Sequence, residues 1–394
     1  MTQTGTEVQR TADIRRANLA AVLRHVDLHP GSSQTDLRAA LGLATGGVSA
    51  LVSQLQTLDV LAGDRAAHGG AGRPRRVLRI HAPGRVAVGV EVTVDAVLVR
   101  VLAMDGTEIA RRDTPLGPVP SSPAELGRLV GERMAAAVPA ASTPLTLTVV
   151  VPGVVSGDQF TLPAFGWHYR PIAETLATAP DVPVVRLLND GDTAALGELR
   201  RGVLRGCQTA VAIHGSNGIA GGIVSGGDIL TGCLGLAGEI GHVIVAPEGP
   251  PCECGQRGCL AQVASVRAMA RDLDETALLL TQGYWDYAAS LAARAEGGEA
   301  AVRAVLDEAR RTLGTVLQTL GAIVSPERIV LTGNLVPLGK HLLPDPPRPL
   351  AAGGLWERPV LLSGFGGDSV LIGAAEDARQ AYFDDVVRLS ARGA

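Results

Sequence analysis

The sequence of 394 residues has few aromatic side chains and one lysine. Phenylalanine, tryptophan and tyrosine make up 3% of the chain, and Lys340 is the lysine, so the positive charge comes almost entirely from arginine. Hydrophobic residues nevertheless make up 46% of the sequence. Apolar packing must therefore come mainly from aliphatic side chains. A chain of this length is expected to form two or three domains rather than one core.

Long apolar segments are also lacking. No hydrophobic run reaches the roughly 20 residues that a membrane-spanning helix needs. The first seven residues, Met1 to Glu7, do not form the apolar core of a signal peptide. We therefore expect a cytoplasmic protein without a membrane partner.

Cysteine is scarce, but Cys252, Cys254 and Cys259 lie close together, downstream of His242. Intervening glycines let this loop fold back so that the four side chains converge. One imidazole and three thiolates form a closed tetrahedral zinc set that leaves no position for a catalytic water. The alternatives are a disulfide or two loop cysteines beside a buried histidine, and a disulfide is disfavoured because nothing marks the chain as exported. The spacing predicts one structural zinc per chain.

The two other cysteines, Cys207 and Cys233, lie outside this set. Free cysteine behaves as a small hydrophobic residue. We expect both to be reduced and buried.

Charge is unevenly distributed along the chain. The first 80 residues hold ten arginines and six acidic residues, a net charge of +4 with histidine neutral. Because the whole chain carries −4, the remainder carries −8. A basic head on an acidic body suggests a nucleic-acid-binding module joined to a body that binds something else.

The first eighty residues have a helix-turn-helix pattern. Apolar residues at helical spacing predict a first helix over roughly 13–25. Ser33 and Asp36 have the spacing of a capping box before a short second helix, and Gly42 and Leu43 predict a tight turn. Thr45 is expected to cap a third helix. The apolar face of that third helix comprises Val48, Leu51, Val52, Leu55 and Leu58.

Two predicted strands, 60–63 and 77–80, follow the third helix and enclose a glycine-rich loop. Arg73, Arg75 and Arg76 lie at and beside the tip of this predicted β-wing. Arginine on such an arm suits the narrow, electronegative minor groove of DNA. The alternative is a small helical domain for protein contacts.

The solvent face of the third helix carries no arginine or lysine. Base reading is therefore expected to depend on Thr45, Ser49, Ser53 and Gln54, with the charge on the wing. This predicts modest direct readout and a large contribution from phosphate contacts.

The body from residue 83 has the pattern of an α/β protein. Strands are predicted at 86–92, 96–102, 107–111 and 145–151, with a helix at 124–138. A buried strand at 184–188 ends in Asn189 and Asp190 before a helix at 193–201. A carboxylate just past the end of a strand lies where α/β proteins bind ligands, although Asp190 could instead cap the helix. Further helices are predicted at 301–320 and 372–388, with a strand at 329–331.

The segment 238–259 reads Gly-Glu-x-Gly-His, then an apolar strand-like run through Val245, then Cys-x-Cys-Gly-x-x-Gly-Cys. It resembles the signature of the ROK family, which contains bacterial sugar kinases and sugar-responsive repressors. Gly72-Arg73-Pro74 is similar to the wing of the repressors. The resemblance implies an actin-like (ribonuclease H-like) body of two α/β lobes behind a winged helix-turn-helix head. The implied domains are the head at 1–80, a first lobe at 81–188 plus 370–394, and a second lobe at 189–369.

The resemblance also implies a sugar site. Asn189 and Asp190 match the pair that binds sugar hydroxyls in the kinases, where the aspartate acts as general base. Glu239 and His242 match other sugar contacts, and His242 could bind zinc with one ring nitrogen and a sugar hydroxyl with the other. The family usually has a glutamate where this chain has Ala261, so one sugar-contacting carboxylate is missing. Pro152, Gly153 and Trp167 are similar to loops that shape the pocket, although Trp167 could be core.

The kinase motif departs further from the family pattern. Its Asp-x-Gly-Gly-Thr, whose backbone approaches phosphates, corresponds here to residues 91–95, Glu-Val-Thr-Val-Asp. Both glycines are replaced by β-branched residues, and Asp95 adds negative charge. A second nucleotide-contacting turn corresponds to 215–222, which could equally be a simple hairpin. The third, 331–335, is not a glycine run. Asp190 is therefore expected to be a vestigial catalytic base.

These observations favour a non-enzymatic DNA-binding regulator, most simply a repressor, that senses a sugar or sugar-derived ligand and binds operator DNA as a homodimer or homotetramer. One alternative is an ATP-dependent sugar kinase of the same family. Another is a regulator without a small ligand, controlled by a protein partner.

Overall fold

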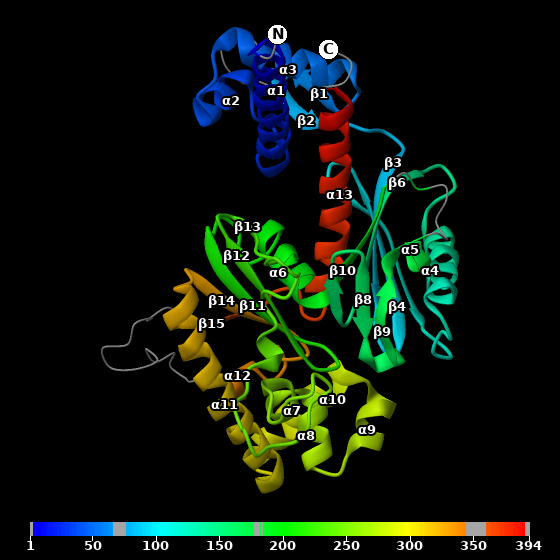
Figure 1. Ribbon diagram of the computed structural model, residues 1–394, viewed down its shortest axis with the longest axis vertical. Coiled ribbons are helices and arrows are strands. Elements are labelled where there is room, and N and C mark those ends of the chain that lie inside the picture. The colour runs from blue at the N-terminus through cyan, green and yellow to red at the C-terminus, as the bar shows by residue number, and fades with distance from the viewer. Residues whose placement is uncertain (1–2, 66–75, 177–181, 183, 344–359, 391–394) are drawn as a thin grey trace.

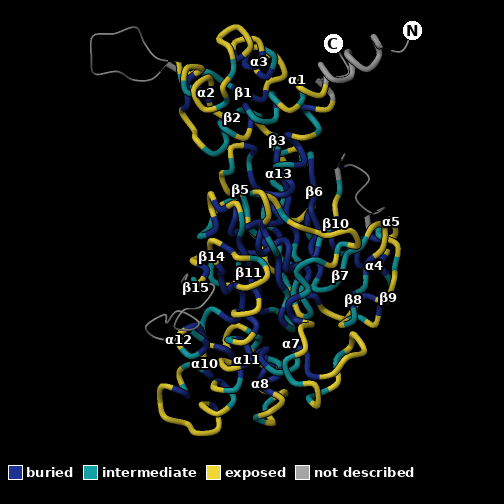
Figure 2. Tube along the Cα trace, turned by 60° about the vertical axis from the view of Figure 1, so that its left-hand side comes forward, coloured by how far each residue is buried: buried dark blue, intermediate teal, exposed yellow. Residues whose placement is uncertain are grey.

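The computed structural model describes residues 3–65, 76–176, 182, 184–343 and 360–390. A small head lies at one end of the molecule and two α/β lobes follow along its long axis (Figure 1). Buried residues follow the strands of both lobes and the helices between them, whereas exposed residues mark the outer loops (Figure 2). Within the described part of the chain, none of the helices is long and apolar enough to cross a membrane.

The described residues of the head form three helices and one antiparallel pair of strands. Its elements are α1 (Gln3–Leu28), α2 (Gln34–Leu41), α3 (Thr45–Thr57), β1 (Leu61–Arg65) and β2 (Arg76–Ile80). The predicted helix-turn-helix and wing strands are confirmed, and β1 pairs antiparallel with β2. The predicted capping box is also present, since Asp36 N donates to Ser33 Oγ and Ser33 N to the Asp36 carboxylate. Gly42 makes the turn with a φ of +65°.

Two details of the head differ from the prediction. Helix α3 has Ala44 as its N-cap, so Thr45 is the first helical residue and does not cap it. Leu58 is 38% exposed, because the helix ends at Thr57. Of the wing arginines, Arg76 begins β2 and is exposed, while Arg73 and Arg75 lie outside the described residues.

The first lobe is built on a five-stranded sheet with the order β10-β6-β3-β4-β5. Strands β3, β6 and β10 are parallel, whereas β3, β4 and β5 form an antiparallel meander. The strands of this sheet are β3 (Arg85–Val92), β4 (Ala96–Ala103), β5 (Glu108–Pro115), β6 (Thr143–Val151) and β10 (Val184–Asn189), with α4 (Pro123–Ala137) and α5 (Ile172–Leu176) as helices.

A small three-stranded sheet extends from the first lobe. It comprises β7 (Val154–Ser156), β8 (Gln159–Leu162) and β9 (Trp167–Pro171), with the 3-10 turn η1 (Pro163–Phe165) between the last two. Trp167 is 8% exposed, and its ring packs edge-on against Phe160 and Phe165. Trp167 therefore belongs to the core.

The second lobe repeats the topology of the first. Its sheet has the order β13-β12-β11-β14-β15, with an antiparallel meander (β11 to β13) followed by parallel strands. The strands are β11 (Thr209–Gly215), β12 (Ile219–Ser225), β13 (Asp228–Ile229), β14 (Arg328–Gly333) and β15 (Val360–Leu362). The helices are α6 (Asp190–Arg200), η2 (Ile240–His242), α7 (Leu260–Ala264), α8 (Val266–Asp272), α9 (Thr276–Gln282), α10 (Tyr284–Glu296), α11 (Ala300–Val324) and α12 (Gly339–Leu342).

The predicted strand-like run after His242 is not a strand. Residues 243–245 belong to a loop in which Ile244 makes one isolated bridge to Cys259. This loop connects His242 to the segment that carries the three clustered cysteines.

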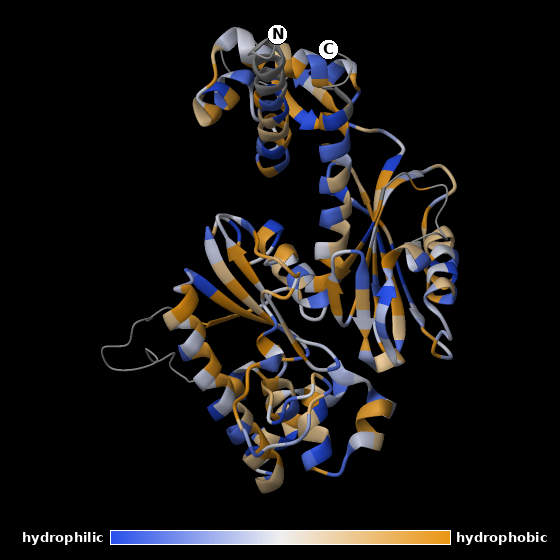
Figure 3. Cartoon of the chain, in the orientation of Figure 1, coloured by the Kyte–Doolittle hydropathy of each residue, from blue (hydrophilic) through white to orange (hydrophobic). Residues whose placement is uncertain are grey.

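Helix α13 (Ser369–Ser390) connects all three parts of the molecule. Its first half contacts α6 of the second lobe and β3 and β6 of the first. A Cβ atom at Gly373 would overlap the carbonyl oxygen of Thr193, so this helix crossing requires glycine. The second half carries Tyr382 and Phe383 into the apolar cluster of the head, and apolar positions recur along the helix (Figure 3). The head therefore shares its core with the C-terminal helix.

Candidate functional site

The four predicted zinc ligands come together in the second lobe. The ligand atoms of His242, Cys252, Cys254 and Cys259 all lie within 4.8 Å of one another. The Sγ atoms of Cys254 and Cys259 are 3.6 Å apart, and His242 Nδ1 lies 3.5 Å from Cys252 Sγ. A tetrahedron with zinc–ligand distances of roughly 2.0–2.3 Å has edges of about 3.3–3.8 Å. The donor set therefore fits a zinc ion.

Local geometry explains how a short loop collects these ligands. His242 ends the turn η2, and Cys259 is the N-cap residue of α7. Gly258 has a φ of +65° and its Cα packs where a side chain would overlap Ala246. Burial raises the pKa of the Cys259 thiol to about 12, so a bound cation is what would hold it as a thiolate. Of the remaining cysteines, Cys207 is buried as predicted, but Cys233 is exposed.

A cavity of about 320 Å³ adjoins the metal centre and is lined by both lobes. The predicted residues Asn189, Asp190, Glu239 and His242 all line it, as do Pro152 and Gly153 of the first lobe. His242 directs Nδ1 to the cysteines, while its Nε2 lies 3.8 Å from Glu239 Oε2. Ala261 and Gln262 lie in the same wall, so a small apolar side chain occupies the place of the family's glutamate.

Helix α6 places Asp190 in this cavity. Asn189 is the N-cap, and its Oδ1 accepts a hydrogen bond of 2.7 Å from Asp192 N. The alternative role of Asp190 as the cap is therefore wrong. The Asp190 carboxylate is 7% exposed and accepts hydrogen bonds from Gly191 N (3.1 Å) and Ser216 Oγ (2.9 Å). These bonds hold it at the junction of the two lobes.

Burial makes these acids weak. It raises the pKa of Asp190 to about 6, and that of Asp192 and Glu239 to about 7 in each case. A carboxyl group that titrates near neutral pH can both donate and accept a hydrogen bond. The hydroxyls of a polyol need both kinds of partner, so the cavity suits an uncharged polyhydroxylated ligand.

Some residues of this cavity were not predicted. Ser216 belongs to the 215–222 segment, for which the resemblance implied nucleotide contacts and a simple hairpin was the alternative. The segment is the turn region of the β11–β12 hairpin, and the Ser216 hydroxyl donates to Asp190. His168 and Tyr169 reach the cavity from β9, and Arg267 from α8. A single polar residue on a strand or helix gives no signal of the cavity that it will face.

A second cavity, of about 520 Å³, lies on the other side of Asp190. Its lining includes the 91–96 hairpin, the 214–217 turn, Gly333 and Asn334. Glu91, Asp95, Asp286 and Asp368 contribute carboxyl groups, and none of the residues in this lining is arginine or lysine. Burial raises the pKa of Glu91 to about 8 and lowers that of His214 to about 4, so His214 adds no positive charge.

In the β3–β4 turn, backbone amides donate hydrogen bonds to a side chain of the same turn. Thr93 Oγ1 accepts hydrogen bonds from Ala96 N (2.9 Å) and Asp95 N (3.4 Å), and it donates to Asp95 Oδ1 (2.6 Å). Phosphate-binding loops offer such amides to the ligand. Here Thr93 accepts the hydrogen bonds of these amides, and the Asp95 carboxylate lies beside them.

The exposed face of α3 is a candidate nucleic-acid interface. Thr45, Ser49 and Ser53 are exposed on it. Gln54 Oε1 accepts from Arg15 of α1 at 2.6 Å, and Thr45 Oγ1 accepts from Arg38 of α2 at 3.2 Å. The positive charge that α3 lacks is thus supplied by arginines of neighbouring helices. Sequence reasoning missed both, since neither is adjacent to α3 in the chain.

Known proteins resemble different parts of this chain. The ROK family profile matches residues 87–381. A glucokinase from Halalkalibacterium halodurans is 37% identical over 188 residues, which cover 45% of this chain and 57% of that protein. A glucokinase from Streptomyces coelicolor is 32% identical over 252 residues, covering 58% of this chain and 78% of that protein. The chain thus spans little more than half the length of the first relative.

One solved structure extends the similarity to nearly the whole chain. A ROK family transcriptional regulator, described as a homologue of the E. coli MLC protein, has a TM-score of 0.76 at 21% identity, covering 97% of this chain and 100% of that one. A Streptomyces griseus ROK family glucokinase, solved with glucose and AMPPNP, has a TM-score of 0.62 at 25% identity, covering 75% and 99%. The expected fold of a two-lobed α/β body with an N-terminal head is confirmed. The chain belongs to the ROK family.

Proposed function

We propose that this protein is a DNA-binding transcriptional regulator, acting as a repressor, whose ROK body senses a sugar or sugar-derived ligand and contains a structural zinc. One observation carries the proposal. A winged helix-turn-helix head is packed onto a ROK body. In that body, the turn that corresponds to the phosphate-binding motif of the kinases has its amides hydrogen-bonded by its own Thr93 side chain. A regulator needs the head and a cavity for the sugar, whereas a kinase also needs a site for the phosphates of ATP.

The head supplies an interface for DNA. Helix α3 presents short polar side chains, which can enter a major groove, and Arg15 and Arg38 lie at positions from which they would reach the flanking phosphates. Arg76 begins the second wing strand. Arg73 and Arg75 precede it in the sequence, and we retain them as wing contacts to the minor groove and backbone.

The cavity beside the metal centre supplies the ligand site. Asn189 and Asp190 enter it at the start of α6, and Glu239 and His242 enter it from the zinc-side loop of the second lobe. A sugar held among them would also contact the first-lobe wall at Pro152 and Gly153. It would favour one relative arrangement of the lobes, which is the requirement for a ligand that changes DNA binding.

A sugar kinase and a regulator without a small ligand are the competing functions. Two observations oppose binding of a nucleoside triphosphate. The amides of the 93–96 turn already donate to Thr93 Oγ1, and the lining of the larger cavity contains no arginine or lysine. The two glucokinases cover only 45% and 58% of this chain. A thermal-shift screen of monosaccharides tests the ligandless alternative, because a ligand that binds only the native state raises its stability.

DNA binding is the decisive test. The wild-type protein should select a two-fold symmetric site from a fragment library and bind it as a dimer or a pair of dimers, since paired heads read paired half-sites. Arg15→Ala and Arg38→Ala should each weaken binding and lower the slope of log K against log salt by about 0.9, as expected for one lost phosphate contact.

Arg128→Ala is the matched control. Its exposed side chain lies on α4 of the first lobe, far from the head, and it pairs with Glu132. This variant should bind the selected site with the wild-type salt slope. Sequence-independent binding by the wild type, or equal losses in all three variants, would refute the proposed interface.

A further inference from the structure

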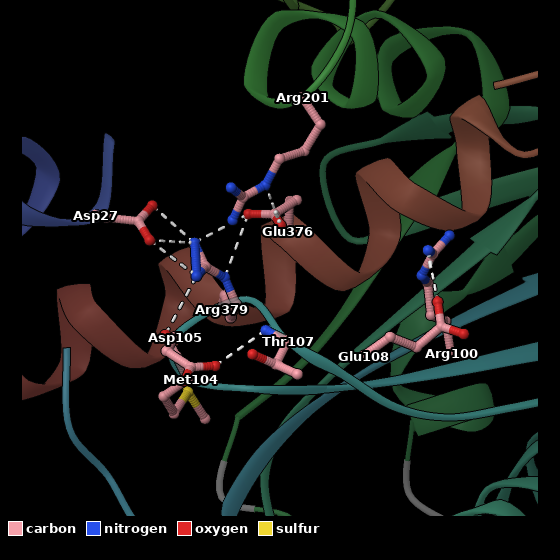
Figure 4. A network of polar contacts seen from close by, with 9 residues as sticks. All are labelled: Asp27, Arg100, Met104, Asp105, Thr107, Glu108, Arg201, Glu376 and Arg379. Carbon is pink, nitrogen blue, oxygen red and sulfur yellow. Dashed lines mark hydrogen bonds and ion pairs between the residues drawn. The ribbon is translucent and has the colours of Figure 1, made fainter. Parts of the chain in front are cut away.

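A buried ionic network joins the head to the body. Arg379 of α13 is 1% exposed, and its guanidinium donates to both carboxylate oxygens of Asp27 in α1, with distances of 2.7 and 2.8 Å. The same group donates to Met104 O at 3.1 Å and pairs with Glu376 at 3.0 Å. Figure 4 shows that the head, α13 and the β4–β5 turn converge on this one side chain.

The network continues into the second lobe. Glu376 Oε1 accepts a hydrogen bond of 2.8 Å from Arg201 Nε, and Glu376 is 6% exposed. Arg201 is the C-cap residue of α6. The chain of contacts therefore runs from Arg201 through Glu376 and Arg379 to Asp27 (Figure 4), and we call these four residues the latch.

Helix α6 has the ligand cavity at its other end. Its first residue is Asp190, which lines both cavities, and its last is Arg200. Eleven helical residues span roughly 16 Å, and a helix of this length moves as a rigid unit. The tight crossing of α6 and α13 at Gly373 leaves no room for the two helices to slide without disturbing each other. A displacement at Asp190 would therefore also shift Arg201.

Buried charges make the latch sensitive to geometry. A buried ion pair is stabilising only while its partners remain well placed, since an uncompensated buried charge is costly. The head also packs on α13 through Tyr382 and Phe383, so its orientation follows that helix. A movement of either the cavity side or the head would therefore change the geometry of the latch.

We propose that the latch transmits the state of the ligand cavity to the DNA-binding head, with α6 and α13 moving together as one packed pair. The idea rests on the proposed function for its biological meaning. The mechanical coupling itself exists in the protein without sugar or DNA, so it can be tested separately.

The first experiment measures amide hydrogen exchange in the unliganded full chain. Coupling is reciprocal, so Asp27→Asn should speed exchange in residues 190–196 of α6, and Arg201→Gln should speed exchange in residues 19–28 of α1, several-fold in each case. The control is Arg186→Gln. Arg186 pairs with Asp377, the residue after Glu376 on α13, but reaches it from β10 and touches neither the head nor α6 through that pair.

Effects of Asp27→Asn confined to the head and α13, together with effects of Arg201→Gln confined to α6 and α13, would overturn the proposal. Equal long-range effects in Arg186→Gln would do the same, since general loosening of α13 would then explain them.

The second experiment uses the selected DNA site, with glucose and N-acetylmannosamine as probes. Arg201→Gln should bind the DNA and show the same sugar-induced thermal shift as the wild type. The sugar-induced change in DNA affinity should fall to within about twofold of none, whereas effector-driven changes are typically about 5–150-fold. A wild-type response in this variant would overturn the latch and leave the proposed function standing. A wild type that binds DNA but responds to no sugar would instead refute the sensing function, with the exchange result still deciding the latch.

Discussion

Two hairpins occupy equivalent places in the two lobes and have opposite properties. The β3–β4 hairpin and the β11–β12 hairpin each begin the antiparallel part of a five-stranded sheet, and each reaches the cavity region around Asp190. In the first, Thr93 Oγ1 occupies the turn amides and Asp95 adds a carboxylate. In the second, Ser216 donates to Asp190, and Asn217 Oδ1 accepts from Tyr284 at 2.5 Å.

The difference shows what a repeated topology does and does not determine. Backbone pairing gives both hairpins the same position in their sheets. The side chains of three or four turn residues then decide whether that position can receive a ligand. Ser216 of the second hairpin hydrogen-bonds an acid of the cavity beside the metal centre, whereas the turn amides of the first hairpin are bonded by its own Thr93. The following experiments test this contrast, beginning with the largest expected effect.

Loss of zinc should damage the ligand-binding side most. Cys254→Ala removes one of four donors from the closed set, so the purified variant should contain no zinc and unfold at a much lower temperature. Structural zinc sites in small peptides contribute about 10–16 kcal/mol, and we expect a loss of several kcal/mol here. Metal analysis and thermal unfolding provide the measurements.

Cys233→Ala is the control for that variant, because Cys233 is also exposed but lies outside the cluster. It should retain one zinc per chain and the wild-type unfolding temperature. Wild-type protein that is fully stable without metal would show that the second lobe does not depend on zinc.

Sugar binding should depend on acids beside the second hairpin. Asp190→Asn and Glu239→Ala should keep the fold, the zinc and DNA binding, but weaken sugar binding by about 10–100-fold, since hydrogen bonds to charged groups contribute about 1.5–3 kcal/mol. Titration calorimetry with glucose and with N-acetylmannosamine gives the affinities. Asp228→Asn, on an exposed carboxylate of β13, should bind as the wild type does. Unchanged affinity in both cavity variants would place the ligand elsewhere.

The acid of the first hairpin should make stability depend on pH. The folded protein retains the proton of Glu91 up to about pH 8, because burial raises its pKa from the usual 4.5, whereas the unfolded chain loses that proton near 4.5. The unfolded state then binds fewer protons, so the free energy of unfolding falls as pH rises from about 5 to 8. Glu91→Gln should remove this loss, stabilising the protein by about 1–3 kcal/mol at pH 8 and by almost nothing at pH 4.

Chemical denaturation at both pH values measures that gain. Asp286→Asn, which changes an exposed carboxyl of the same cavity, is the control. A gain for Glu91→Gln that is equal at pH 4 and pH 8 would show that packing, rather than ionisation, is responsible.

Nucleotide should have no effect. Addition of magnesium and ATP should leave the unfolding temperature unchanged, and coupled assays should detect no phosphorylation of glucose or N-acetylmannosamine. The physical reason is the closed turn at Thr93 and the acidic lining of the cavity beside it. Measurable turnover would show that the amides of the β3–β4 turn can be released to bind phosphate. The two hairpins would then not differ in their ability to receive a ligand.

Local patterns were sufficient for much of this molecule. The zinc ligands lie within 18 residues of one another, and the helices and strands follow from spacing of apolar residues over one or two turns. Such signals depend on neighbours in the chain, which the sequence contains directly. The structure differs from the sequence-based predictions where two local conformations are similar in energy. Ala44 rather than Thr45 caps α3, a loop rather than a strand follows His242, and Cys233 is exposed.

The tertiary structure alone decided which distant residues meet. Asp27 and Arg379 are 352 positions apart, Ser216 reaches Asp190 from another strand, and Arg15 lies over Gln54 from another helix. A lone arginine or serine has the same appearance in a sequence whether it faces solvent, DNA or a buried acid. Its partner is chosen only when helices and sheets pack, because burial and geometry then determine which charges must pair.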